Sequence, residues 1–112
     1  MNEYFLTTIG IDRQIVSEFR TQLEAIVPVL DLRMFGSRAR GDASEDSDLD
    51  VFIKVKSLDR SLREKIYDLA WEIGFERDRL ISTFVVSEAD ITTGAVGASP
   101  LLAKVMQEGI II

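Results

Sequence analysis

Two carboxylates and a Gly-Ser pair are the residues of this chain whose types and spacing best suit chemistry. Asp48 and Asp50 stand two residues apart where a hydrophobic run begins, so in a strand their side chains point to one face. Parallel carboxylates repel each other unless a cation lies between them, and oxygen ligands completed by substrate phosphates suit Mg²⁺. Gly36 lets the backbone approach a ligand closely, and Ser37 offers a hydroxyl and an N–H to a phosphate. We therefore expect a metal and phosphate site between residues 36 and 50.

Composition leaves acid–base and metal chemistry to carboxylates. The 112 residues contain no histidine and no cysteine, which excludes an imidazole base, a disulfide and a zinc-thiolate framework. The length is that of one small domain, and we expect residues 1–112 to form it. A net charge of −6 argues against general affinity for nucleic acid. Without an apolar run near the ~20 residues of a membrane span or a signal peptide, we expect no membrane association and a cytoplasmic location.

Hydrophobic spacing predicts the elements that must position these residues. The expected helices cover roughly 12–26, 59–74 and 99–109, and the expected strands cover 29–35, 51–55 and 79–86. Asp12 is expected to cap the first helix, and Gly74 to end the second. The small residues of 87–98 predict a loop, and the apolar end, 110–112, predicts a short strand or an interface.

This order of elements is that of an α/β or α+β fold with a small mixed sheet and helices packed on it. If the residues at 36–37 and 48–50 serve one site, the two strands that flank them are antiparallel, because one ends and the other begins there. The second and third strands are joined by a helix, which is the usual parallel crossover.

The spacing Gly36-Ser37, ten residues, Asp48-x-Asp50 resembles the signature of the DNA polymerase β-like nucleotidyltransferase superfamily. The Gly-Ser-Arg-x-Arg-Gly opening and the short chain are similar to its minimal nucleotidyltransferase (MNT) branch. The resemblance implies that Asp48 and Asp50 hold Mg²⁺, normally two ions, against the phosphates of ATP. It also implies that Gly36 and Ser37 cradle the β- and γ-phosphates.

The arginines of the same motif have two interpretations. Arg38 and Arg40 could contact phosphates, or they could anchor the loop by pairing with its acidic residues, because a guanidinium fork suits both partners. The candidate acidic partners are Asp42, Glu45 and Asp46.

A third carboxylate is implied on the next strand, where family members use it to bind metal and to position or deprotonate the acceptor hydroxyl. Asp78, just before the third expected strand, is our candidate, and Glu76 is its competitor. The strand itself offers Ser82 and Thr83 instead of an acid. The role of Asp78 is therefore the least secure part of the expected site.

The resemblance implies a nucleotidyltransferase that moves AMP from ATP to a hydroxyl and releases pyrophosphate. In the MNT branch the acceptor can be a tyrosine of a HEPN-domain toxin, so AMPylation would make this protein the antitoxin of a toxin–antitoxin pair. One alternative is an inactive module that neutralises a HEPN partner by binding, and another is a transferase for aminoglycoside-like small molecules. Trp71 is expected to contact the core or a partner, and a hetero-oligomer or homodimer is expected.

Overall fold

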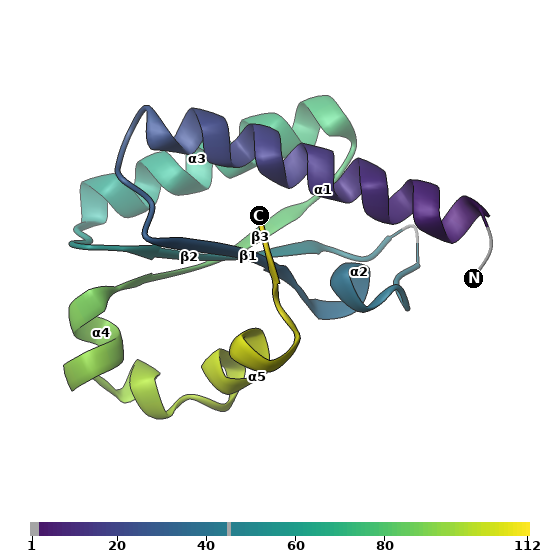
Figure 1. Cartoon of the computed structure of the whole chain (residues 1–112). Coiled ribbons are helices and arrows are strands. Elements are labelled where there is room, and N and C mark those ends of the chain that lie inside the picture. Colours follow the sequence, from purple (N-terminus) through teal and green to yellow (C-terminus); the bar gives the residue numbers. More distant parts are fainter. Residues whose placement is uncertain (1–2, 45) are drawn as a thin grey trace.

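Four strands form one mixed sheet in the order β3-β2-β1-β4. Figure 1 shows this sheet between two layers of helices. The computed structural model describes residues 3–44 and 46–112. Strand β1 (Asp31–Phe35) pairs antiparallel with both β2 (Leu49–Val55) and β4 (Ile110–Ile111). Strand β2 pairs in parallel with β3 (Ile81–Ser87). The mixed α/β sheet and both predicted strand directions are confirmed.

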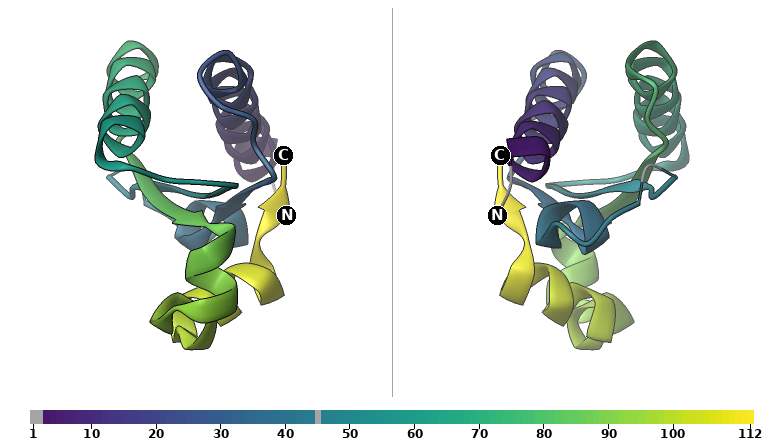
Figure 2. Two further views of the ribbon diagram at one scale, coloured as in Figure 1. Left: turned by 90° about the vertical axis from the view of Figure 1, so that its left-hand side faces the viewer. Right: turned by 90° about the vertical axis from the view of Figure 1, so that its right-hand side faces the viewer.

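Helices cover both faces of this sheet. The long helices α1 (Glu3–Glu24) and α3 (Arg60–Arg77) pack on one face, and α4 (Glu88–Thr93), the 3-10 helix η1 (Ala95–Ala98) and α5 (Pro100–Glu108) lie on the other (Figure 2). A short helix, α2 (Gly36–Arg40), follows β1 directly. Within the described residues, none of the helices combines the length and the apolar character that a membrane span needs.

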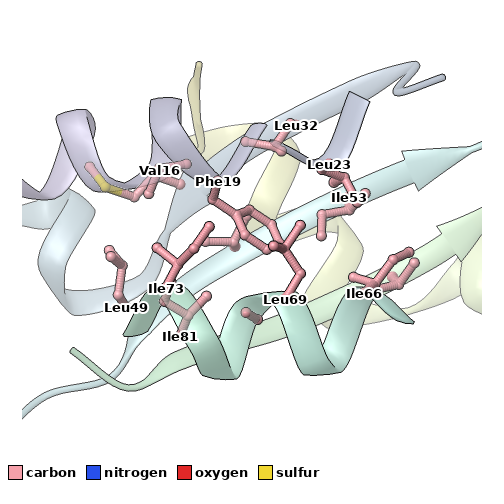
Figure 3. Packing of buried hydrophobic residues seen from close by; sticks show 14 of the residues in the cluster. Val16, Phe19, Leu23, Leu32, Leu49, Ile53, Ile66, Leu69, Ile73 and Ile81 are labelled. Atoms are coloured by element: carbon pink, nitrogen blue, oxygen red, sulfur yellow. The ribbon is translucent and has the colours of Figure 1, made fainter. Parts of the chain in front are cut away.

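The larger core lies between the sheet and the two long helices. Phe19 of α1 is fully buried at its centre, between side chains of α3 and the sheet (Figure 3). Alternate residues of β2 face this core, namely Leu49, Val51, Ile53 and Val55. A smaller cluster on the opposite face contains Phe35, Phe52, Val86, Leu102 and Val105. Because side chains alternate along a strand, Asp50 shares the face of Phe52, toward α5.

The ends of the two long helices differ from the expected ones. Asp12 does not cap α1, because the helix begins at Glu3 and Asp12 is buried within it. Gly74 does not end α3, which continues to Arg77 and ends at Asp78 in the left-handed conformation (φ 56°). A Cβ on Gly74 would lie 2.4 Å from the Arg79 carbonyl oxygen, so this glycine allows the chain to return close to the helix.

The segment 87–98 is not the expected loop. It forms α4 and η1, and a reciprocal cap begins α4: the Asp90 N–H donates to the Ser87 hydroxyl, and the Ser87 N–H donates to the Asp90 carboxylate. The loop between the first two strands likewise begins with a helix, α2. The last helix is confirmed with its Ser99 cap, and so is the short strand at the apolar end.

Candidate active site

The sheet brings the Gly-Ser pair to Asp50, as the motif spacing predicts. Asp50 stands opposite Phe35 at the end of β1 and beside Ser82 of β3. A hollow of about 510 Å³ opens over these residues on the α5 side of the sheet. It is lined by Phe35, Gly36, Ser37, Arg40, Asp50, Ser82, Thr83, Phe84, Leu101 and Lys104. Its size is in the usual range for a small-molecule site.

The electrostatic environment of Asp50 favours a bound cation. The pKa of its half-buried carboxyl is raised, first by burial and then by the negative charge of Asp48, while the positive charge of Arg40 opposes the shift. The two aspartates are therefore near enough to repel each other, as their spacing of two residues at the start of β2 predicts. A divalent cation between them would relieve both the repulsion and part of the burial penalty. The donor set thus fits Mg²⁺, with substrate oxygens completing its coordination.

Gly36 is required at this site for a reason that the sequence did not show. Its φ of 77° lies in the left-handed region, and a Cβ there would stand 2.2 Å from Oδ2 of Asp50. Any side chain at this position would meet the carboxylate of Asp50. Glycine therefore leaves room for the metal-ligand candidate itself, whereas close approach to a phosphate stays a prediction.

Arg38 anchors the loop that leads to Asp48. Its side chain is buried, its Nε donates to the Ser47 carbonyl oxygen at 2.8 Å, and its Nη1 donates to Oδ2 of Asp12 at 3.1 Å. Asp12 is fully buried and also accepts from Nε of Arg79 at 2.9 Å. The anchoring interpretation is therefore the one that the contacts favour, and Asp12 of α1, which was not among the expected loop partners, is an acidic partner of Arg38.

Arg40 stays at the mouth of the hollow. Its Nε donates to Asp42 at 3.2 Å, which is one of the expected loop pairs, and its Nη1 donates to Glu108 at the end of α5 at 2.9 Å. Lys104 of α5 lines the same hollow and was missed in the sequence. Lys104 stands one helical turn after Leu101, and this spacing was the sequence signal that could have placed both residues on one side of the helix. Of the other expected loop acids, Asp46 is exposed and Glu45 lies outside the described residues.

The expected catalytic role of Asp78 stays a prediction, because Asp78 does not line the hollow at Asp50 but shares a separate hollow with Asp46 and Ser47. Because α3 continues to Arg77, Asp78 is its C-cap and lines hollows on the side of α1 and α3. Its competitor Glu76 is exposed on α3 and also lies on that side. The neighbour of Asp50 in β3 is Ser82. Among the side chains that the structure describes, no group of three or more potential metal-binding residues is assembled.

Comparison with known proteins agrees with this geometry. The family model for the nucleotidyltransferase domain matches residues 16–90. The chain belongs to this family. The match spans β1, the Gly-Ser and Asp-x-Asp motifs, α3 and β3, and it confirms the family recognised from the spacing of those motifs.

Individual relatives extend the match. A Methanocaldococcus jannaschii protein named "putative protein adenylyltransferase" is 37% identical over 75 residues, which are 64% of this chain and 76% of that protein. A solved structure described as a toxin-antitoxin with AMP-PNP shares the fold, with a TM-score of 0.61 and 19% identity, over 88% of this chain and 69% of that one. The polymerase β-like nucleotidyltransferase fold and the MNT branch are thereby confirmed for this chain.

Proposed function

We propose that this protein is a Mg²⁺-dependent transferase that moves AMP from ATP to a hydroxyl group of a partner protein. The observation that carries the proposal is the half-buried carboxylate of Asp50, whose charged form is disfavoured first by burial and then by Asp48, placed against Gly36 at a hollow in the size range of small-molecule sites. The name of the Methanocaldococcus jannaschii relative supports a protein acceptor. The toxin-antitoxin neighbour with AMP-PNP supports both an adenine nucleotide and a toxin as partner.

Each residue of the hollow has a place in this reaction. Asp48 and Asp50 would hold Mg²⁺, which supplies charge neutralisation at the attacking and leaving oxygens. Ser37 and the backbone of Gly36 would bind the β- and γ-phosphates, whereas Arg40 and Lys104 would add positive charge around them. The acceptor oxygen bonds to the α-phosphorus, the bond from that phosphorus to the bridging oxygen breaks, pyrophosphate leaves and the hydroxyl proton is released.

The acceptor that we propose is a tyrosine of a HEPN-domain toxin, which AMPylation would silence. This protein would then be the antitoxin of the pair. A phenol suits a site where β3 places Ser82 and not an acid beside Asp50, because the proton of a phenol is more acidic than that of an alcohol and needs a weaker base.

A second candidate function is neutralisation of the same partner by binding alone. The specific observation in its favour is Ser82, which stands beside Asp50 at the place where the third acid was expected. A binding module has no need to hold two repelling carboxylates at a hollow, so we rank transfer above it.

Intact-mass spectrometry of the HEPN partner tests the proposal. After incubation with this protein, ATP and Mg²⁺, we expect the partner to gain the mass of one or more AMP groups. Asp48→Ala and Asp50→Ala should each reduce the yield at least 100-fold, because one carboxylate cannot hold the metal alone. The matched control is Glu24→Ala, which removes an exposed carboxylate at the end of α1 on the other face of the sheet and should leave the yield unchanged.

Two results would contradict this assignment. Full transfer by either aspartate variant would mean that the metal site lies elsewhere. A stable complex in which the partner never gains mass, with any nucleotide, would leave neutralisation by binding as the function.

A further inference from the structure

The exposed surface of α3 carries an aromatic ridge that the core does not use. Tyr67, Trp71 and Phe75 follow one another at intervals of four residues, which places them on one side of the helix. They are 64%, 58% and 81% exposed, while the opposite side of α3 is buried against the sheet and α1. Three large aromatic side chains in a row on solvent form the kind of patch that marks an interaction surface. We refer to these three residues as the aromatic ridge.

An acidic ridge runs beside it at the same interval. It consists of Glu64, Asp68, Glu72 and Glu76, all of them exposed. Glu64 pairs with Arg60, whereas the other three have no ion-pair partner within the part of the chain that the structure describes. The two ridges together present apolar side chains bordered by negative charge, of which only that of Glu64 is paired among the described residues.

The aromatic ridge leads toward the candidate active site. At its C-terminal end, Trp71 and Phe75 line a hollow of about 380 Å³ together with Leu80, which is itself 53% exposed. The opposite wall of this hollow includes Asp46 and Ser47, the residues just before Asp48. The Leu80 carbonyl accepts from the N–H of Leu49 at 2.8 Å. Because Leu49 stands between Asp48 and Asp50, this bond fixes the Leu80 side of the hollow to the start of β2. A molecule seated on the ridge would therefore adjoin the loop that carries Asp48.

We propose that the aromatic ridge, with Leu80, is the docking surface of the acceptor protein, and that the acceptor covers it with an apolar patch bordered by Lys and Arg side chains. This inference rests on the proposed function for the nature of the occupant. Aromatic side chains are the usual anchors at the centre of an interface, and a border of opposite charge steers association. The acidic ridge disfavours nucleic acid and an anionic membrane, since both are negatively charged. A second copy of this chain, with a net charge of −6, would also bring like charges together.

The affinity of the HEPN partner for variants of this surface tests the inference. We expect the double variant Trp71→Ala/Phe75→Ala to raise the Kd at least tenfold, and Asp68→Lys/Glu72→Lys to raise it most at low salt. The control Ile26→Ala removes an exposed apolar side chain, 42% exposed, just beyond α1 and should leave the Kd unchanged. Since Trp71 and Phe75 are exposed, circular dichroism and thermal unfolding should show an intact fold.

The same samples separate this inference from the proposed transfer. If the docking surface is correct, Asp48→Ala abolishes AMP transfer but keeps the complex, and the double aromatic variant loses transfer only at limiting partner concentration. Complex formation that needs Trp71 and Phe75, without transfer, would overturn the proposed reaction and support the docking surface. Transfer and a Kd that are unchanged in the double variant would overturn the docking surface alone.

Two further results would also contradict the docking surface. A wild-type dimer that the double variant converts to monomer would assign the aromatic ridge to a second copy of this chain. If the wild-type protein neither bound the partner nor transferred AMP to it, both proposals would be overturned.

Discussion

At the scale of single residues, Asp50 combines the strongest chemical signal in the chain with an unfavourable environment. Its carboxylate is half-buried, lies beside a second negative charge, and is kept in place by a glycine that cannot be replaced without contact. Burial is the first cause of its raised pKa and Asp48 the second. Because protein folds are selected for function as well as stability, a destabilised carboxylate at a hollow is a feature of a site and not of a scaffold.

This environment predicts a stabilising substitution. The raised pKa means that the fold penalises the charged form of Asp50, so its contribution to stability is lost as pH rises through the folded pKa and is regained as pH falls. Asp50→Asn, which cannot ionise, should therefore raise the Tm at pH 7, and the difference from wild type should vanish below the ordinary aspartate pKa of 3.8. Thermal unfolding measured between pH 3 and pH 8 checks this.

Magnesium provides the control for the same experiment. Mg²⁺ should raise the Tm of the wild-type protein at pH 7, because it binds the folded pair of aspartates, and it should have little effect on Asp50→Asn. If Asp50→Asn had a lower Tm than wild type at pH 7, the charged carboxylate of Asp50 would stabilise the fold, contrary to its raised pKa.

At the scale of elements, Asp12 joins three parts of the chain that are distant in sequence. From inside α1 it accepts hydrogen bonds from Arg38 of α2 and Arg79 before β3, and Arg38 in turn holds the Ser47 carbonyl next to Asp48. The loop that carries the site is therefore fixed to the helical layer by a buried charge network.

Removal of the acidic member should be costly. Asp12→Asn removes the buried negative charge that pairs with Arg38 and Arg79, and we expect it to lower the free energy of unfolding by about 3 kcal/mol. The comparison variant Glu24→Gln breaks an exposed pair with Arg20 and should change the free energy of unfolding by less than about 1 kcal/mol. Urea unfolding measures both values, and equal effects of the two substitutions would show that the network does not contribute as proposed.

Some helices, strands and contacts were predicted correctly from the sequence, and others were not. The strands, the parallel crossover and the approach of Gly36 to Asp50 followed from periodicity and motif spacing, because both depend on local order. The helix α4 was missed although Ser87-x-x-Asp90 is a capping-box pattern, since the small residues that follow it resemble a loop. The partner of Arg38 could not be found in this way, because a contact between residues 26 positions apart depends on how α1 crosses the sheet.

At the scale of the whole molecule, the two faces of the sheet have different tasks. The core under α1 and α3 is the larger, and Phe19 at its centre is fully buried. The cluster under α5 is small, with Leu102 and Val105 as its helical members, and it supports the wall of the hollow that bears Lys104. The larger core and the proposed nucleotide hollow thus lie on opposite sides of the sheet.

This division predicts two different responses to truncation. Phe19→Ala should lower the free energy of unfolding by about 3–5 kcal/mol and so populate the unfolded chain, because it leaves a cavity in the larger core. Val105→Ala removes a smaller side chain from the cluster under α5, so it should loosen that helix locally, with faster amide hydrogen exchange in residues 100–108 and little change in α1 and α3. If the exchange rates of all helices rose together in Val105→Ala, the two sides of the sheet would form one cooperative unit.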